Sequence, residues 1–483
     1  MGLFEPPYPE GLPIAGDWIT ENVQRSTVYF PYDGSVVAPA PVGIVEHANR
    51  ALEAGVRIQP TVARLPASAR RRLLLDVGVA LAENRHDIEQ LLVAETGKPL
   101  IDCQTEVSRT LFTWDAAAEA ITSLHGETVP LDLQPGGEGM IGFWSRKPIG
   151  LVIGIAGFNY PLLLATHKIA PSIAAGCAVI CKPAPNTPLT TLWLVHLIRQ
   201  AAQNLEIPAD IVQLVTGGPE VGKALTTDPR IGAVSFTGSA AVGHQIARDC
   251  APKKTLLELG SNAALIVADD ADLDAAADAV VRGAFYGNGQ ACISIQRVIV
   301  DGKVHEELVK RVVERIGEVK IGDPREPDTR VAALIDARST ERVLAWIGEA
   351  TGQGARIAFG GKVIGTVLEP TVLVDVPNRV QVWDEEIFGP VVCIRTAADV
   401  GDAIALVNES RYGLQASVYT TSLTTAFRAI EELEVGGVVV NQVPGYRNDI
   451  MPYGGVKDSG IGREGPRFAM EELTVTRMAI IKP

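Results

Sequence analysis

The chain has 483 residues, of which 47% are hydrophobic and 21% are charged. This length exceeds what one hydrophobic core normally supports, so two or three domains are expected, and the composition excludes a largely disordered chain. The net charge of −14 disfavours partners such as nucleic acid or an anionic membrane. No run of about 18 apolar residues predicts a membrane span.

The first residues, Met1–Glu10, contain proline and glutamate but no basic stretch followed by an apolar one. We therefore expect no secretory signal. The six cysteines have no disulfide-framework spacing, which favours a cytoplasmic protein with reduced thiols. No H-E-x-x-H, paired C-x-x-C or Walker sequence is present, so no metal site is predicted.

Helical patterns dominate the first part of the chain, at Glu46–Ala54, Ala67–Asn84 and Gln104–Leu124. Helices at these places can cover a sheet. The Gly- and Pro-rich stretch Pro130–Gly139 and the tail Thr474–Pro483 are expected to be projecting strands rather than core.

Between residues 149 and 258, apolar strand patterns alternate with helical patterns. This alternation predicts parallel βαβ units, and ligands bind at the carboxyl ends of the strands in such sheets. The strands are expected at Ile149–Ala156, Cys177–Cys181, Ile211–Val215, Ala233–Phe236 and Thr255–Leu259, and the helices at Pro161–Ala175, Thr187–Asn204, Pro219–Thr226 and Ser239–Asp249.

A second α/β region follows. Its first helix is expected to be capped by Asp269 or Asp270 and to extend to about Tyr286. The strands are expected at Asn262–Ala268, Arg297–Val300, Thr371–Val374, Val391–Arg395, Ala416–Thr420 and Gly437–Asn441, and the other helices at Val304–Glu318, Ser339–Glu349, Val400–Asn408 and Thr424–Glu432.

Cys292 follows two glycines, Gly287 and Gly289, which break the preceding helix and permit close backbone approach. A cysteine after such a turn can lie near free backbone N–H groups, which lower a thiol pKa and can bind an oxyanion. The alternative is a small buried hydrophobic residue, and this alternative is favoured for Cys177 and Cys181 inside their predicted strand.

Glu258 ends an apolar strand and precedes a glycine. A carboxylate there faces the ligand crevice, and burial would raise its pKa toward that of a general base. A surface glutamate at a turn is the alternative. Asn159 lies between a strand and a helix, where its amide can donate to developing negative charge or cap the helix that Pro161 begins.

Three further segments suit a dinucleotide. Lys182 follows a strand, where a cation suits ribose hydroxyls or phosphates. Phe236–Ser239 ends another strand and opens a helix, whose N-terminus suits a pyrophosphate. Glu385–Pro390 predicts a turn with two carboxylates and an aromatic ring. Each segment can equally be a plain turn. Gly460–Gly465 matches G-x-G-x-x-G but follows no apolar strand, so we do not assign it to phosphate binding.

Taken together, these segments resemble the aldehyde dehydrogenase superfamily from about residue 12 to the C-terminus. The resemblance depends on many short motifs in the family's order. They are Gly157-Phe-Asn159-Tyr-Pro161, Lys182-Pro-Ala-Pro185, Phe236-Thr-Gly-Ser239, Glu258-Leu-Gly-Ser261, Gly289-Gln-Ala-Cys292, Glu386-Ile-Phe-Gly-Pro390, Asn441 and Pro452-Tyr-Gly-Gly-Val-Lys-Asp-Ser-Gly460.

The family's fold is α/β, with a Rossmann-type coenzyme domain, an α/β catalytic domain and a β oligomerisation arm. By resemblance, residues 1–124 and 146–259 would form the coenzyme-binding domain and residues 260–440 the catalytic domain. Residues 125–145 and 466–483 would form the arm, which implies a homodimer or homotetramer. Residues 441–465 would be the substrate loop and the linker back to the arm.

The resemblance also implies catalytic roles. Cys292 resembles the nucleophile, whose thiolate attacks the aldehyde to give a thiohemiacetal and, after hydride transfer, a thioester. Asn159 and the backbone N–H of Cys292 resemble the oxyanion hole. Glu258 resembles the base that activates water, and Glu464 matches a second carboxylate that some members use as a proton relay.

The implied coenzyme is NAD or NADP. Lys182 and Glu386 resemble the residues that hold the two riboses, and Phe388 would pack beside the nicotinamide. NAD-preferring members often have glutamate where this chain has Pro185, so the choice of coenzyme stays open. The pyrophosphate and adenine neighbourhood would include Gly222, Phe236, Gly238 and Ser239.

Some residues depart from the common family pattern. Ser261 and Asn262 stand where Gly-Lys is common, and Cys292 is followed by Ile-Ser-Ile-Gln-Arg297. These variants look most like lactaldehyde dehydrogenases and non-phosphorylating glyceraldehyde-3-phosphate dehydrogenases, which suggests a small polar or anionic aldehyde. The presence of Glu258 favours hydrolysis over transfer to coenzyme A, because CoA-acylating members usually lack it.

Arg447 lies where the family's substrate loop falls and can contact an anionic group, or it can be a solvated loop residue. Tyr160, Trp114 and Tyr446 can instead supply an aromatic wall, which would favour an aromatic or other apolar aldehyde. A CoA-acylating relative and a non-catalytic binding protein are the remaining alternatives.

Overall fold

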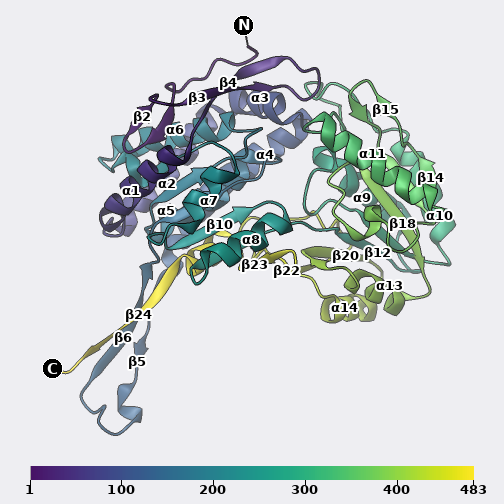
Figure 1. Cartoon of the computed structure of the whole chain (residues 1–483). Coiled ribbons are helices and arrows are strands. Elements are labelled where there is room, and N and C mark those ends of the chain that lie inside the picture. Colours follow the sequence, from purple (N-terminus) through teal and green to yellow (C-terminus); the bar gives the residue numbers. More distant parts are fainter. Residues whose placement is uncertain (1) are drawn as a thin grey trace.

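The structure is a computed structural model that describes residues 2–483. Two large sheets form its two main regions, and a narrow arm projects from the first of them (Figure 1). The first sheet has the order β23-β11-β10-β7-β8-β9 and is parallel except at β23. Its strands are β7 (Val152–Ile155), β8 (Val179–Lys182), β9 (Val212–Leu214), β10 (Ala233–Thr237), β11 (Lys254–Glu258) and β23 (Gly460–Ile461).

The second sheet has the order β14-β17-β18-β13-β12-β20-β21 and is parallel except at β14. The mixed α/β fold predicted from the sequence is confirmed by these two sheets. The strands are β12 (Ala264–Val267), β13 (Arg297–Asp301), β14 (Arg356–Phe359), β17 (Thr371–Val374), β18 (Val391–Ala397), β20 (Gln415–Tyr419) and β21 (Gly437–Val440).

Helix α5 (Pro161–Ala175) begins and ends at the predicted residues. Proline suits the first position of a helix, because an N–H there would have no partner within the helix. Gly176 ends the helix in the left-handed conformation, with φ of 85°. The helix is buried almost along its whole length, between the first sheet and α4. The other helices of this sheet are α6 (Leu189–Asn204), α7 (Pro219–Thr227) and α8 (Ala240–Cys250).

The N-terminal region contains one helix that the sequence did not predict. This helix, α3 (Arg85–Thr96), follows α2 (Ala67–Glu83) with only Asn84 between them, so no proline or glycine marks the boundary. Helix α1 (Val45–Val62) is longer than predicted, because Pro60 lies in its last turn and does not end it. Helix α4 (Leu100–Ala120) packs against both α2 and α5.

Helix α9 (Leu273–Phe285) is capped by Asp272, not by Asp269 or Asp270 as predicted. The Asp272 carboxylate accepts hydrogen bonds from the N–H groups of Asp274 and Ala275 at 3.0 and 3.1 Å. Asp270 instead binds the hydroxyls of two threonines that follow β20. The remaining helices of this region are α10 (His305–Ile316), α11 (Ala337–Gly352), α12 (Gln381–Asp384), α13 (Val400–Asn408) and α14 (Leu423–Glu432).

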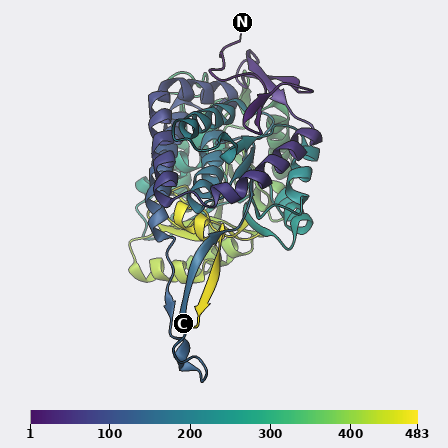
Figure 2. The same cartoon turned by 90° about the vertical axis from the view of Figure 1, so that its left-hand side faces the viewer.

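The arm is a three-stranded sheet of β5 (Thr128–Val129), β6 (Ile141–Pro148) and β24 (Thr474–Ile481), and the C-terminus lies on it (Figure 2). The tail is thus a strand, as predicted. The stretch Pro130–Gly139 is not, because Gly136 and Gly139 have positive φ and a short 3₁₀ helix occupies Leu131–Leu133. Before β24, helix α15 (Pro466–Glu472) packs against α5 and α4.

The remaining short strands were not predicted from the sequence. Two antiparallel pairs precede α1, and two more lie in the second half of the chain. They are β1 (Leu12–Ile14) with β2 (Asp17–Ile19), β3 (Gln24–Tyr29) with β4 (Val36–Val42), β15 (Val363–Ile364) with β16 (Val367–Leu368), and β19 (Tyr412–Gly413) with β22 (Val456–Lys457). Across residues 2–483, no helix combines the length and apolar character needed to span a bilayer.

Candidate active site

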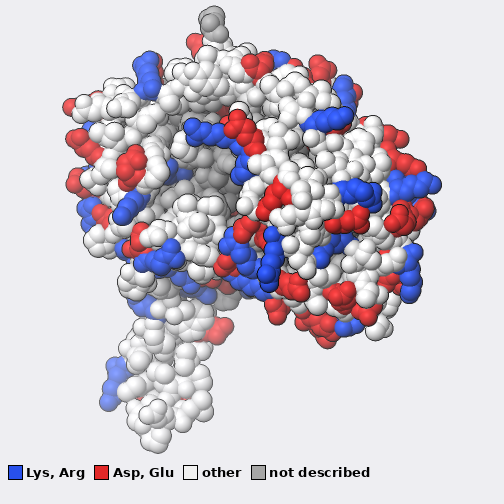
Figure 3. Space-filling view, turned by 45° about the vertical axis from the view of Figure 1, so that its right-hand side comes forward, with Lys and Arg blue, Asp and Glu red and all other residues white. Residues whose placement is uncertain are grey.

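A cavity of about 380 Å³ is lined by residues at the strand ends of the first sheet, by helix and loop residues of the second region, and by the loop after β21. The space-filling view shows the molecule hollowed on one face, with both basic and acidic side chains around the rim (Figure 3). Nine residues singled out from the sequence line the cavity: Asn159, Tyr160, Gly238, Ser239, Glu258, Cys292, Glu386, Phe388 and Arg447. Lys182, Gly222, Phe236 and Glu464 lie outside its lining.

Cys292 is partly exposed and follows a turn of unusual backbone conformation. Gly287, Asn288 and Gly289 have φ of 57°, 62° and 70°, so three successive residues are left-handed. A Cβ at Gly289 would lie 2.2 Å from the carbonyl oxygen of Gly389, which explains why glycine is required there. The two glycines predicted to shape this turn therefore do so.

Buried polar groups hold this turn in place. The Asn288 amide donates to the carbonyl oxygens of Gly97 (3.1 Å) and Ala333 (2.9 Å), and its oxygen accepts from the N–H of Ala332 (2.8 Å). The carboxylate of Asp102, on α4, accepts from the N–H of Gly287 at 2.9 Å. No local sequence pattern marks either residue, because their partners are distant along the chain.

The Cys292 thiol lies in an environment that disfavours the thiolate. Burial raises its pKa to about 11, and the charges of Glu386 and Glu258 act in the same direction. A hydrogen bond with the Tyr453 hydroxyl, 3.4 Å from Sγ, and the charge of Arg447 lower the pKa. At neutral pH the thiol of the free protein is therefore mostly protonated.

Glu258 is the last residue of β11 and is buried beside a second carboxylate, Glu464. Burial and the charge of Glu464 raise the pKa of Glu258 well above its ordinary value. Its Oε2 atom has no hydrogen-bond partner among the described residues. Burial would also raise the pKa of Glu464, but the cations Lys168 and Arg447, together with His167, outweigh burial and hold that pKa well below its ordinary value.

Of the two carboxyls, Glu464 is therefore stabilised in its ionised form, whereas Glu258 holds its proton to a higher pH than an ordinary carboxyl. The ion pair of Glu464 with Lys168 and its 3.0 Å contact with Arg447 fix this charge distribution. A protonated, unpaired carboxyl that faces a cavity can exchange its proton with bound water.

The Asn159 side chain lies against the cysteine turn. Its Nδ2 donates to the carbonyl oxygen of Gln290 at 2.7 Å, and Gln290 is itself held by the N–H of Ile335 at 3.1 Å. A carboxamide has two N–H donors, so one is left to point into the cavity. This arrangement differs from the helix-cap alternative, in which the Asn159 oxygen would accept from helix N–H groups.

Several residues outside and along the cavity fit a dinucleotide. Lys182 ends β8 and is only 7% exposed. Its ammonium group makes no hydrogen bond or ion pair with another described residue. Burial lowers its pKa, as expected for a cation that lacks a counter-charge in contact. A Cβ at Gly222 would lie 3.7 Å from the Lys182 side chain, so the glycine keeps the space beside the cation open.

The carboxylate of Glu386 lies on the other side of the cleft. Its Oε1 accepts from the N–H of Ser261 at 3.0 Å, and a Cβ at Gly260 would lie 2.6 Å from its Oε2. Burial raises the pKa of Glu386 to about 7. The ring of Phe388 meets that of Phe158 edge to face, with centroids 5.6 Å apart.

At the end of β10, the ring of Phe236 lies under Gly238. A Cβ at Gly238 would approach this ring to 2.5 Å, and Ser239 is the cap of α8. Backbone N–H groups at such a helix start bind phosphate oxygens. The space beside Gly222, the buried cation of Lys182 and this helix start together fit the phosphates and riboses of a nicotinamide coenzyme.

Arg447 is buried, not a solvated loop residue. Its side chain is 6% exposed, pairs with Glu464 (3.0 Å) and Asp449 (3.3 Å), and stacks on the Tyr453 ring at 3.8 Å from the centroid. Trp114 does not line this cavity, because it is buried in the core, where its indole N–H donates to the Thr166 hydroxyl. It therefore cannot contribute to an aromatic wall.

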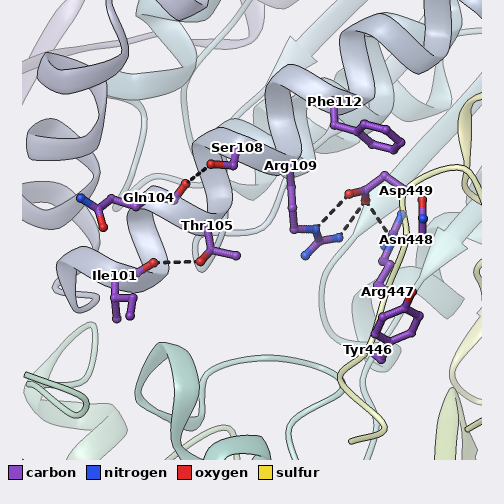
Figure 4. A pocket seen from close by; sticks show the side chains of 10 residues that line it. All are labelled: Ile101, Gln104, Thr105, Ser108, Arg109, Phe112, Tyr446, Arg447, Asn448 and Asp449. Carbon is purple, nitrogen blue, oxygen red and sulfur yellow. Dashed lines mark hydrogen bonds and ion pairs between the residues drawn. The ribbon is translucent and has the colours of Figure 1, made fainter. Parts of the chain in front are cut away.

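A second cavity of about 470 Å³ opens between α4 and the loop Tyr446–Asp449 (Figure 4). Arg109 and Arg447 line both cavities. Arg109 points from α4 to Asp449, and its Nε and Nη2 atoms lie 3.0 and 2.8 Å from the carboxylate oxygens (Figure 4). The sequence did not single out Arg109, because its partner lies far along the chain.

Comparison with known proteins places this arrangement in a class. The chain matches the profile of the Aldehyde dehydrogenase family over residues 18–479. It is 36% identical over 472 residues to 3-sulfolactaldehyde dehydrogenase of Priestia aryabhattai, covering 98% of each chain. It is 34% identical to lactaldehyde dehydrogenase of Methanococcus aeolicus, covering 97% of this chain and 99% of the relative.

Among solved structures, glyceraldehyde-3-phosphate dehydrogenase GapN of Methanocaldococcus jannaschii, complexed with NADP, is 31% identical with a TM-score of 0.92. That match covers 95% of this chain and all of the other. The fold and cleft thus define an oxidoreductase of the NAD(P)-dependent class, and solved relatives hold NADP or NAD+. The chain belongs to the aldehyde dehydrogenase family. The expected likeness to the lactaldehyde and glyceraldehyde-3-phosphate dehydrogenases is confirmed.

Proposed function

We propose that this enzyme oxidises a small polar or anionic aldehyde to a carboxylic acid, with NAD or NADP, through a thioester on Cys292. The observation that supports this most directly is the meeting of two groups in one cavity. The partly exposed sulfur of Cys292 shares the cavity with the buried, unpaired carboxyl of Glu258. A nucleophile beside a carboxyl of raised pKa suits acyl transfer to water.

In the first stage, the Cys292 thiolate attacks the carbonyl carbon, and the oxygen gains negative charge. The free N–H of Asn159 and the backbone N–H of Cys292 would bind this oxygen. The left-handed turn before Cys292 fixes the direction of that backbone, so the donors need little rearrangement. When bound, the oxidised nicotinamide accepts a hydride and brings a positive charge that favours the thiolate.

In the second stage, Glu258 would take a proton from water as the water attacks the thioester. This requires the ionised form of Glu258, which its raised pKa disfavours. Glu464, ionised and buried beside it, would accept or pass on the proton through bound water. Such general-base help is typically worth about 10²–10⁴-fold in rate.

For the coenzyme, Lys182 and Glu386 would hold the two riboses, and the start of α8 at Gly238 and Ser239 would bind the pyrophosphate. Gly222 and Phe236 would border the adenosine half, and Phe388 the nicotinamide. Lys182 is the strongest support, because a buried cation without a partner is stabilised when a polar or anionic group reaches it.

The preference for a polar or anionic aldehyde is supported by the cations of the cavity. Arg447 and Arg109 line it, and each shares Asp449 as a counter-ion. An anionic substrate could compete with Asp449 for these guanidinium groups. 3-Sulfolactaldehyde and glyceraldehyde 3-phosphate, named for two relatives, both have an anionic group. Tyr160, whose ring also lines the cavity, would contact the carbon chain.

We also infer that the arm joins copies of the chain into a homodimer or homotetramer. The arm exposes large apolar side chains, including Leu133 of its 3₁₀ helix at 86% and Ile480 of β24 at 62% exposure. Contiguous apolar surface of this kind is typical of a protein–protein interface. The domain boundaries assigned to the coenzyme, catalytic and arm segments follow the same proposal.

The test is the Cys292→Ala enzyme, assayed with a panel of hydroxy-, carboxy-, phospho- and aromatic aldehydes and both coenzymes. We expect no aldehyde-dependent NAD(P)H formation. Coenzyme binding, measured by fluorescence titration, should be retained. Product analysis of the wild type with and without coenzyme A distinguishes the free acid from an acyl-CoA. Unchanged turnover in the variant, or a product that requires coenzyme A, would overturn the proposal.

A further inference from the structure

Tyr453 lies between β22 and the loop of Arg447, and its hydroxyl reaches the cavity beside Cys292. The oxygen is 3.4 Å from the Cys292 sulfur. Among residues 2–483 it is the only side-chain group within hydrogen-bond distance of that sulfur. The tyrosine is 3% exposed, so little water competes for this contact.

The hydroxyl has little freedom to turn away from the sulfur. One face of the ring is covered by the guanidinium of Arg447, and the ring packs with Ile293 and Leu414 in a small apolar cluster. The backbone of Tyr453 is paired with Glu464 in both directions, at 3.1 and 2.6 Å. The oxygen is thus aimed at Cys292 by both backbone and ring.

The direction of the hydrogen bond follows from the acidity of the two groups. Burial and the negative charge of a Cys292 thiolate raise the pKa of the Tyr453 phenol well above its ordinary value. Once the thiol ionises, its sulfur has no proton to donate, whereas the phenol has one. The tyrosine must be the donor and the sulfur anion the acceptor.

We propose that Tyr453 is a catalytic residue that stabilises the Cys292 thiolate by donating a hydrogen bond to it. The thiol gives its proton to solvent, and the phenol keeps its own. The sulfur then uses its electron pair to form the C–S bond. As that bond forms, the charge leaves the sulfur, so the hydrogen bond is strongest in the state that must be prepared before attack.

Other ionisable groups also face Cys292 but act through space. The carboxyls of Glu258 and Glu386 disfavour the thiolate, and the cation of Arg447 favours it. Burial and the charge of the sulfur raise the pKa of the Tyr286 phenol, and its buried hydroxyl has no hydrogen-bond partner among the described residues. Of these neighbours, Tyr453 alone gives the sulfur a direct donor.

The role of Tyr453 in aldehyde oxidation rests on the function proposed above, but the hydrogen bond can be tested without aldehyde or coenzyme. The measurement is the pH dependence of Cys292 alkylation by iodoacetamide, in which the thiolate displaces iodide to form a thioether. We expect Tyr453→Phe to raise the thiol pKa by about one unit, so that alkylation near neutral pH slows about tenfold.

Tyr419→Phe is the matched control, since Tyr419 is buried in the second sheet and contacts neither cavity group named above. We expect its alkylation profile to match that of the wild type. Replacement of Tyr453 by 3-fluorotyrosine, a more acidic donor of similar size, should lower the thiol pKa instead. This second variant keeps the test decisive where the phenylalanine variant folds poorly.

An unchanged alkylation profile in Tyr453→Phe, or an equal shift in Tyr419→Phe, would overturn the assignment. These outcomes leave the function of the enzyme untouched, because Cys292→Ala tests that separately. Failure of Cys292→Ala to abolish oxidation would conversely overturn the proposed function while leaving the measured thiol pKa intact.

Discussion

The two sheets contribute to the cleft in different ways. The first sheet presents side chains at the carboxyl ends of its strands, where Lys182 and Glu258 complete β8 and β11. The second region presents Cys292 on the loop between α9 and β13, whose shape depends on polar groups far away in the sequence. Strand ends place a side chain by local geometry, whereas the loop needs the surrounding fold to hold it.

This difference predicts that substitutions at strand ends change one step of the chemistry, whereas substitutions behind the loop change stability and several steps together. The four predictions that follow test this contrast, the first three in order of expected size and the fourth through its pH dependence. A factor of ten in rate or affinity corresponds to about 1.4 kcal/mol, which puts effects on catalysis and stability on one scale.

The largest effect is expected for Glu258→Gln. Loss of the base should reduce steady-state turnover by about 10²-fold or more, with acyl-enzyme accumulating after a burst of NAD(P)H. In the wild type, deacylation should accelerate as pH rises, because the raised pKa of Glu258 delays its ionisation relative to an ordinary carboxyl. Rapid-quench mass spectrometry measures both the accumulation of acyl-enzyme and the pH dependence of deacylation. The Glu431→Gln variant, changed at an exposed position, is the control. Normal deacylation in the variant would show that Glu258 is not the base.

Asn288→Ala should destabilise the fold by about 2–4 kcal/mol, because two carbonyls and one N–H lose their buried partner. We expect a lower urea midpoint and also slower acylation, because the turn before Cys292 loses the hydrogen bonds that fix its conformation. Exposed Asn49→Ala serves as the control. A variant as stable as the wild type but inactive would place Asn288 among groups that act on chemistry alone.

Lys182→Met should weaken coenzyme binding, with Kd about tenfold higher than in the wild type. The rate at saturating coenzyme should stay close to that of the wild type, because the cation contributes to binding rather than to chemistry. Isothermal titration with each coenzyme measures this, and exposed Lys310→Met is the matched change elsewhere on the surface. Equal affinity in the variant would argue against a ribose contact at this position.

The last prediction concerns the pH dependence of Asp102→Asn, which keeps an acceptor for Gly287 but removes the charge. Burial raises the pKa of Asp102 to about 6, so the folded state binds this proton more tightly than the unfolded state. The resulting stabilisation is fully present below about pH 4 and is lost as pH rises to about 6. The wild type should therefore lose stability relative to the variant over that interval.

Melting temperatures of both proteins between about pH 4 and pH 7 measure this difference, with exposed Asp115→Asn as control. A constant difference across the interval would show that Asp102 ionises normally. A difference that grows with pH in favour of the wild type would indicate a depressed pKa, which contradicts the buried setting.

The sequence by itself determined the α/β class, most strands and helices of both sheets, and the motifs that lie at strand ends. These features depend on hydrophobic periodicity and on local signals such as Pro161 at the start of α5. Cys292 was marked by the glycines beside it, because a left-handed turn needs those residues. The cap of α9 was assigned to the wrong residue because several aspartates lie close together, and α3 was missed because no proline or glycine separates it from α2.

Only the tertiary structure decided how the site is charged and held. Asp102, Arg109 and Tyr453 act on partners that are remote along the chain, and no local pattern distinguishes them from surface residues. The opposite pKa directions of Glu258 and Glu464 likewise depend on which cations reach each carboxylate. Burial and pairwise distance set these properties, and both exist only after the chain has folded.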